Sequence, residues 1–158
     1  MKIKRLLLFL LACLCIPFSL WSNPVDGLLE RICPGASHKF IIQLQKGGND
    51  FFELDQKGNK VVIRGNNYVN IATGLNWYLK YYAGIHLSWN GMTAQLPESL
   101  PKVDTPLHKE TNLSLRYDFN YCTYSYTMAF WDWNRWEKEI DWMALHGINL
   151  PLAAVGQE

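Results

Sequence analysis

The first stretch with a clear periodicity lies near the start of the chain. Its apolar residues recur at the spacing i, i+3, i+4, i+7 that places them on one helix face: Val25, Leu28, Leu29 and Ile32. Asn23 and Pro24 precede them and suit a helix cap and a first-turn proline. Because Pro34 and Gly35 disfavour a continuing helix, the pattern predicts a short amphipathic helix that ends near Cys33.

The hydrophobic pattern then changes from the helical period to that of strands. Three runs rich in β-branched, aromatic and other apolar residues lie at residues 40–44, 51–54 and 61–63, and each predicts a strand. Residues 56–59, Gln-Lys-Gly-Asn, lie between the last two runs and suit a tight turn. We therefore expect the second and third strands to form a β-hairpin.

A second amphipathic helix is predicted after the hairpin. Its apolar face consists of Ile71, Leu75, Tyr78, Leu79 and Tyr82. Asn67 or Asn70 would cap its start, and Gly84 would end it. Residues 85–89 predict one further short strand. The order β-β-β-α-β predicts a small sheet with helices on one face, a small N-terminal α+β domain over residues 23–96.

The pattern changes again after this predicted domain. Residues 97–114 contain three prolines among polar and charged residues and show neither period, which indicates a linker. Beyond it the chain predicts a strand at residues 115–121, a helix at 133–146 and a strand at 148–155. This order is a βαβ unit, from which parallel sheets and barrels are built.

The predicted helix of the βαβ unit has clear end signals. Asp132 is its expected N-cap and Gly147 its expected C-terminal stop. Its expected buried stripe consists of Trp133, Trp136, Ile140 and Met143. A complete (β/α)₈ barrel needs about 250 residues, so the fold class is α/β and α+β, with residues 115–158 as the start of an incomplete, truncated TIM barrel. Because parallel strands are normally covered on both faces, we expect the chain to be the N-terminal part of a longer protein.

The first 22 residues have the layout of a secretory signal peptide. Residues 1–5 are basic and residues 6–14 are almost wholly apolar, a run shorter than the roughly 20 residues of a membrane span. We expect cleavage near Ser22 and export to the periplasm or extracellular space, or to the lysosome in a eukaryote. A lipid anchor at Cys13 is the alternative, because residues 10–13 look like a bacterial lipobox.

Composition and charge narrow the classes of function. The chain of 158 residues is 49% apolar and 18% charged, as soluble globular proteins are. Three of its 15 basic residues lie in the leader, so 12 basic residues face 14 acidic ones in the remainder. No basic stripe is present there, and this excludes the usual electrostatic footprint of a nucleic-acid-binding protein.

Two cysteines, Cys33 and Cys122, remain once the leader is set aside. They would allow one disulfide in an oxidising compartment, but they form no disulfide framework and no C-x₂-C metal pair. We therefore predict no structural metal.

Candidate binding residues follow the two predicted parallel strands, because barrel enzymes place their sites at the carboxyl ends of the strands. Asn120 and Cys122 follow the first strand, and Gln157 and Glu158 follow the second. Amide and carboxylate groups in such a mouth suit a polyhydroxylated ligand. The alternative is structural: Asn120 and Gln157 would cap loops, Cys122 would be buried filler, and Glu158 would be an exposed acid at a helix start.

Other conspicuous residues of the predicted helix are interpreted structurally. The tryptophans between residues 131 and 142 suit packing better than sugar stacking, because the apolar face of a barrel helix packs on the strands. The acids Glu137, Glu139 and Asp141 are expected to be solvated. Arg135 and Glu139 have the i, i+4 spacing of a weak ion pair.

Beyond these patterns, the residues of the second half resemble a known family. The motifs that carry the resemblance are Arg116-Tyr117, Asn120-Tyr121-Cys122-Thr123-Tyr124-Ser125-Tyr126, Trp131-Asp132-Trp133-Asn134-Arg135-Trp136 with its continuation to Leu150, and Gly156-Gln157-Glu158. They are similar to the alpha-N-acetylglucosaminidases of glycoside hydrolase family 89. Residues 61–91 are similar to the small N-terminal domain of that family.

The resemblance implies a retaining exo-hydrolase that removes terminal alpha-linked N-acetylglucosamine from glycans, without a metal or other cofactor. It implies two catalytic Glu about 5 Å apart, both beyond Glu158, so the 158-residue chain alone is predicted to be inactive. Asn120 and Cys122 match the first-strand residues of the family that line the sugar pocket, and Gln157 and Glu158 match its second-strand end. All four are carried over as binding candidates only. Two alternatives stay open: a secreted carbohydrate-binding module, and a hexosaminidase or glucuronidase with another substrate.

Overall fold

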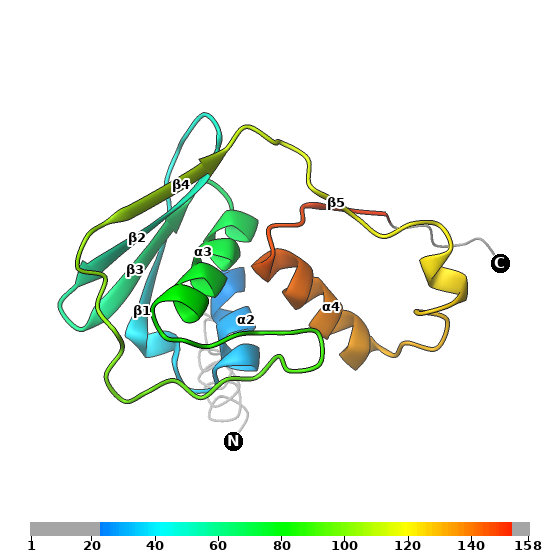
Figure 1. The fold of residues 1–158 in the computed structure, drawn as a ribbon, viewed down its shortest axis with the longest axis horizontal. Helices are drawn as coiled ribbons and strands as arrows, with labels where there is room; N and C mark the ends of the chain where they lie inside the picture. The colour runs from blue at the N-terminus through cyan, green and yellow to red at the C-terminus, as the bar shows by residue number, and fades with distance from the viewer. Residues whose placement is uncertain (1–22, 153–158) are drawn as a thin grey trace, which may run out of the picture.

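The computed structural model describes residues 23–152 (Figure 1). The predicted signal peptide with Cys13, and the candidates Gln157 and Glu158, lie outside the described residues. The elements follow in the order α2 Pro24–Ile32, η1 Ser37–Lys39, β1 Phe40–Leu44, β2 Asp50–Lys57, β3 Lys60–Gly65, α3 Tyr68–Tyr81, β4 Leu107–Thr111, β5 Tyr117–Asp118, η2 Thr123–Ser125, α4 Trp133–Leu145 and β6 Leu150–Pro151.

A four-stranded sheet forms the larger part of the fold, with the strand order β1-β3-β2-β4. β1 and β3 are parallel, while β2 runs antiparallel to both of its neighbours. The hairpin predicted between β2 and β3 is confirmed, because Lys57 pairs with Lys60. Gly58 has a φ of 60° at the turn, in the left-handed region that glycine tolerates.

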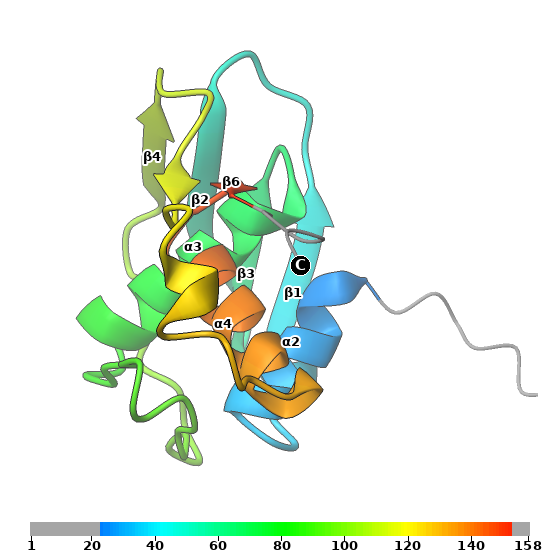
Figure 2. The same cartoon turned by 90° about the vertical axis from the view of Figure 1, so that its right-hand side faces the viewer.

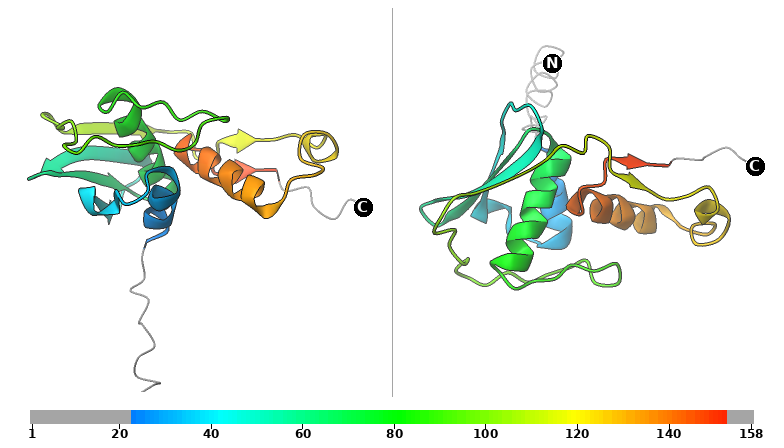
Figure 3. Two further views of the ribbon diagram at one scale, coloured as in Figure 1. Left: turned by 90° about the horizontal axis from the view of Figure 1, so that it is seen from below. Right: turned by 45° about the horizontal axis from the view of Figure 1, so that its top comes forward.

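Helices α2 and α3 cover one face of this sheet, as the sequence predicted (Figures 1 and 3). The predicted caps are present: the Asn23 side chain accepts hydrogen bonds at the start of α2, and Asn67 accepts one from the Asn70 amide. The core between the layers contains the apolar residues of both helix stripes and of the strands, among them Leu29, Leu54, Ile63, Ile71 and Leu79.

The structure corrects two expectations about the segment after α3. Residues 85–89 form no strand and contribute only an isolated bridge between Ser88 and Gly91. Residues 107–111, inside the expected linker, form β4 and pair antiparallel with β2. The sequence Leu-His-Lys-Glu-Thr does not predict this strand, because β4 lies at the sheet edge, where charged side chains are exposed and no apolar alternation is needed.

The predicted βαβ unit is present in the second half of the chain. β5 and β6 pair in parallel, Tyr117 with Leu150, and α4 connects them (Figure 2). Asp132 caps α4 by accepting a 2.9 Å hydrogen bond from the Arg135 amide, and Gly147 follows with a φ of 78°. The fold is therefore a small α+β unit followed by the start of a TIM barrel, as predicted.

The predicted buried face of α4 is wrong for two of its four residues. Of the expected stripe, Trp133 is 66% exposed and Ile140 is 46% exposed, while Met143 is buried. The face that is buried includes Glu139 and Asp141 and packs beside α2 and α3 (Figure 2). Polar contacts with residues distant in the sequence decide this orientation, and the helical period of α4 alone does not contain them.

Candidate functional site

The carboxyl end of β5 has an unusual backbone conformation. Phe119 follows the strand directly and has a φ of 71°, the one positive value at a non-glycine position among residues 23–152. Its amide donates a 2.8 Å hydrogen bond to Oδ1 of Asp118. Side chains disfavour this left-handed region, so the surrounding structure must hold Phe119 in place.

Asn120 and Cys122, two of the predicted binding residues, share the turn that follows. Oδ1 of Asn120 accepts hydrogen bonds from the Cys122 amide, at 2.9 Å, and from the Thr123 hydroxyl, at 3.2 Å. Asn120 is exposed and Cys122 is half-buried. The oxygen of Asn120 thus caps the turn into η2, the structural role that was the alternative to ligand binding. Its Nδ2 group donates no hydrogen bond within the described part of the chain and is accessible to a ligand.

An open hollow of about 690 Å³ lies beside this turn. Polar groups from Asp118, Asn120 and Thr123 line it together with the ring of Trp142. Cys122 is not among its lining residues. Carboxylate, amide and hydroxyl groups next to an aromatic ring can bind a polyhydroxylated ligand, since they offer both donors and acceptors beside an apolar surface.

Three aromatic rings pack against one another behind the turn. The Phe119 ring meets Trp136 and Tyr124 edge-on, at centroid distances of 6.5 and 6.3 Å. Tyr124 and Trp136 stack on each other at 6.0 Å. The Tyr124 hydroxyl donates a hydrogen bond to the carbonyl of Leu152, next to β6. These contacts join η2, α4 and the ends of both parallel strands. Core packing, the predicted use of Trp136, is what the structure contains.

A charged cluster joins the start of α4 to the segment after α3. The Arg135 guanidinium lies over the rings of Trp131 and Trp89, 3.9 and 4.6 Å from their centroids. It also forms a 2.8 Å ion pair with Glu139, which confirms the predicted i, i+4 pair. The Trp89 indole donates to the same carboxylate. The expectation that Glu139 is solvated is wrong: it is 3% exposed, because Arg135 and Trp89 compensate its burial.

A second ion pair anchors the middle of α4 to α2. Nε and Nη2 of Arg31 each donate a 2.6 Å hydrogen bond to Asp141, whose side chain is 7% exposed. These hydrogen bonds raise the pKa of Arg31. Asp141 was also expected to be solvated, and the structure corrects this. The two residues are 110 positions apart, so no local signal in the sequence could have paired them.

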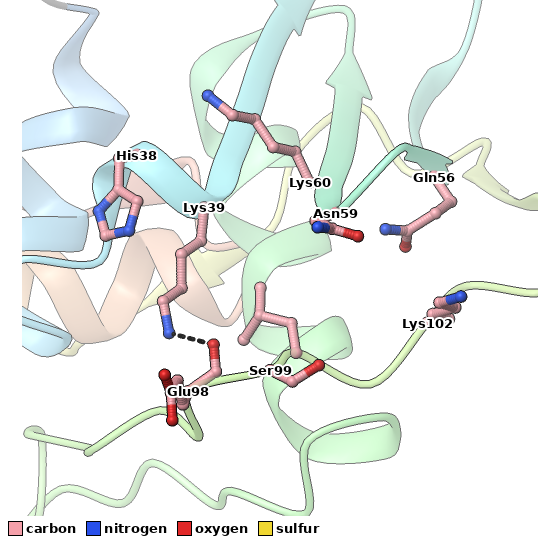
Figure 4. A pocket seen from close by; sticks show the side chains of 9 residues that line it. His38, Lys39, Gln56, Asn59, Lys60, Glu98, Ser99 and Lys102 are labelled. Carbon is pink, nitrogen blue, oxygen red and sulfur yellow. Dashed lines mark hydrogen bonds between the residues drawn. The ribbon is translucent and has the colours of Figure 1, made fainter.

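A separate hollow of about 430 Å³ lies in the small α+β unit (Figure 4). It is lined by residues of η1, the β2–β3 turn and residues 98–102. Nζ of Lys39 donates to the carbonyls of Pro97 and Glu98, at 2.7 and 3.0 Å. That lysine therefore fastens the connecting segment to η1, and the hollow is distant in the fold from the turn after β5 (Figure 1).

Among residues 23–152, no group of three or more His, Cys, Asp or Glu side chains could hold a metal ion. No helix in the same range is long and apolar enough to cross a membrane.

Comparison with known proteins identifies the family. The model of the alpha-N-acetylglucosaminidase N-terminal domain matches residues 23–102, and the model of the TIM-barrel domain of the same enzymes matches residues 116–158. The two-part fold is thus that of the N-terminal part of a barrel glycoside hydrolase. The chain belongs to the alpha-N-acetylglucosaminidase family, glycoside hydrolase family 89, which confirms the resemblance noted in the sequence.

Individual relatives agree with the family match. Human alpha-N-acetylglucosaminidase is 44% identical over 141 residues, which are 85% of this chain and 19% of the human protein. A family 89 glycoside hydrolase from Clostridium perfringens, in complex with PUGNAc, is 41% identical with a TM-score of 0.79 over 85% of this chain. A second Clostridium perfringens structure, in complex with its substrate GlcNAc-alpha-1,4-galactose, is 40% identical with a TM-score of 0.75 over 82% of this chain.

The matched region is a small part of these relatives. The chain spans 16% of the Clostridium perfringens chain bound to PUGNAc and 15% of the one bound to its substrate. It corresponds to the small N-terminal domain and the first part of the barrel.

Proposed function

We propose that the protein to which this chain belongs hydrolyses terminal alpha-linked N-acetylglucosamine residues of glycans. The observation that carries the proposal is the pair of family matches, over residues 23–102 and 116–158, to two consecutive domains of alpha-N-acetylglucosaminidases. The relative bound to GlcNAc-alpha-1,4-galactose supports the same substrate class. The reaction is hydrolysis with retention of configuration, and it requires two carboxyl groups about 5 Å apart on either side of the glycosidic bond.

The contribution of this chain is to bind and orient the sugar, because both catalytic Glu are expected beyond residue 158. The Nδ2 group of Asn120 would donate to a sugar oxygen beside the hollow after β5. Cys122, Gln157 and Glu158 are proposed as further rim residues. Glu158 is proposed only as a binding residue and not as one of the catalytic pair.

The decisive experiment measures hydrolysis of an aryl alpha-N-acetylglucosaminide by the full-length gene product. Release of N-acetylglucosamine with retained alpha configuration, followed by proton NMR, is the expected result. The beta anomer and an aryl glucuronide serve as matched controls. Cleavage of either control in preference to the alpha-N-acetylglucosaminide would refute the proposed specificity.

The role of Cys122 can be tested in the same assay. If its thiol contacts the sugar, Cys122→Ser should lower kcat/KM while the melting temperature stays close to that of the unchanged enzyme. Cys122 is half-buried and does not line the hollow, and both facts favour a packing role over contact with the sugar. An unchanged kcat/KM would assign Cys122 to packing.

Export is proposed on the layout of the first 22 residues. Expression of the full-length gene with fractionation should place the product outside the cytoplasm. Sequencing of its amino terminus then separates cleavage near Ser22 from cleavage before a lipidated Cys13. A product that keeps Met1 and stays in the cytoplasm would refute export.

A further inference from the structure

Phe119, which follows β5, has a backbone conformation that the packing of the small α+β unit does not explain. Its φ of 71° lies in a region that an aromatic residue rarely occupies. Such a residue persists where its surroundings over-determine it, and these places cluster at functional sites. Phe119 also lies at the carboxyl end of β5, next to Asn120, and lines the hollow there.

The contacts of Phe119 come from three separate segments. Trp136 of α4 and Tyr124 of η2 hold its ring edge-on, and Tyr124 is itself fastened to the carbonyl of Leu152 beyond β6. Oδ1 of Asp118 accepts its amide proton at 2.8 Å. The ring contacts and the amide hydrogen bond together select the left-handed backbone over the extended one.

The left-handed residue determines where Asn120 lies. In an extended conformation, Phe119 would continue the direction of β5 and carry Asn120 away from the turn. In the structure the chain bends instead, so that Oδ1 of Asn120 accepts from the Cys122 amide and the Thr123 hydroxyl. This capping fixes the amide plane and leaves the Nδ2 group as a donor beside the hollow.

We propose that Phe119 is a positioning residue that sets the Asn120 amide for binding the N-acetylglucosamine ring. The proposal rests on the proposed function, because it assigns Asn120 to the sugar. Phe119 acts through the backbone: its ring, held by Tyr124 and Trp136, keeps the bend, and the bend orients the amide. The ring itself need not touch the ligand.

The experiment uses the full-length gene product and compares substitutions of Phe119 that separate the ring from the backbone. Phe119→Ala removes the ring but keeps a side chain that disfavours positive φ, whereas Phe119→Gly removes the ring and tolerates it. Phe119→Tyr keeps the ring and is the conservative variant. KM and kcat for an aryl alpha-N-acetylglucosaminide are measured well below the melting temperature of each variant, and the Kd for N-acetylglucosamine is measured by calorimetry.

The expected order of affinity is Phe119→Tyr, then Phe119→Gly, then Phe119→Ala. KM and Kd should rise about tenfold in Phe119→Ala, with kcat little changed, because a contact equally strong in ground and transition states affects KM alone. Phe119→Gly should recover part of this loss. If Phe119 lay in an ordinary loop, Phe119→Gly would bind the sugar more weakly than Phe119→Ala, since glycine adds flexibility.

A double substitution tests whether Phe119 acts through Asn120. If it does, Phe119→Ala combined with Asn120→Ala should bind no more weakly than Asn120→Ala alone, because both remove the same contact. Additive losses would overturn the proposal, as would a lower melting temperature with unchanged KM and Kd. Binding of N-acetylglucosamine by Phe119→Ala as tight as by Phe119→Gly would overturn it too.

The same data separate this inference from the proposed function. If the unchanged enzyme shows no turnover but binds N-acetylglucosamine, the proposed hydrolysis fails and the Kd values still decide the role of Phe119. If it shows neither turnover nor binding of N-acetylglucosamine, both proposals are wrong. If it shows turnover without measurable binding of free N-acetylglucosamine, the KM values decide the role of Phe119.

Discussion

Replacing Gly74 by alanine would place a methyl group where α3 meets the sheet. A Cβ atom there would lie 2.9 Å from Cγ2 of Ile63 and 3.2 Å from Cβ of Phe52. Both neighbours are buried, and Ile63 is fully so. Neither atom is the free end of a flexible side chain, so the helix and the sheet would have to separate.

Two opposing effects set the magnitude. Overpacking a core costs about 1–3 kcal/mol, and the rigid neighbours of Gly74 place this site near the upper value. Alanine in a helix interior contributes about 1 kcal/mol relative to glycine. We therefore expect Gly74→Ala to lower the free energy of unfolding by about 2 kcal/mol.

Gly27 in α2 is the matched control. It is also a helix-interior glycine, but a Cβ atom there would meet only Nη1 of Arg31, at 3.5 Å, which is ordinary contact. Gly27→Ala should therefore raise the free energy of unfolding by about 0.5–1 kcal/mol. The same glycine-to-alanine substitution is therefore expected to change the free energy of unfolding in opposite directions at the two sites.

Urea unfolding of the chain from residue 23 onward, followed by far-ultraviolet circular dichroism, measures both changes. With an m-value of about 2 kcal/mol per molar, Gly74→Ala should lower the midpoint by about 1 M and Gly27→Ala should raise it slightly. Equal shifts in one direction would refute the reasoning, because they would mean that helix propensity alone decides both sites.

Two further predictions concern charged contacts. Glu139→Ala should lower the free energy of unfolding by about 2–3 kcal/mol, less than the usual loss for a buried ion pair because Arg135 reaches solvent. It should also weaken the packing of Trp89. Unchanged stability and unchanged tryptophan fluorescence would contradict this prediction. A hydrogen bond to Glu53 raises the pKa of His108 above its ordinary value of 6.5. The stabilisation of the folded chain by the His108–Glu53 pair is therefore fully present below pH 6.5 and is lost as the pH rises through the folded-state pKa of His108. His108→Asn should therefore destabilise the chain at about pH 5 and much less at about pH 9. An equal loss of stability at both pH values would exclude the ion pair.

The start and stop signals of the helices could be predicted because each depends on a few neighbouring residues. Asn23, Asn67 and Asp132 each cap the helix that begins beside them. The β2–β3 hairpin has a glycine in its short turn. The candidate site was predicted only as a position, the end of a parallel strand, because βαβ topology places that end at the mouth of a barrel.

The details of the site could not be predicted. Nothing local indicates that Phe119 takes a positive φ, since an aromatic residue ordinarily disfavours it. The buried charges of α4 were missed because the periodicity of apolar residues assumes that acids face water. β4 was missed because an edge strand with one half-exposed face needs few apolar residues.

The amino-acid sequence by itself determined the family, the positions and caps of helices α2, α3 and α4, the β2–β3 hairpin and the βαβ order of the second half. These features depend on neighbouring residues and on a motif of twenty or so positions. The tertiary structure alone decided which face of α4 is buried, which segment completes the sheet, and how the chain bends after β5. The physical reason is that these features depend on partners far away in the chain. Arg31 compensates the burial of Asp141 across 110 positions, and the rings of Tyr124 and Trp136 hold a backbone conformation that Phe119 would not adopt without them.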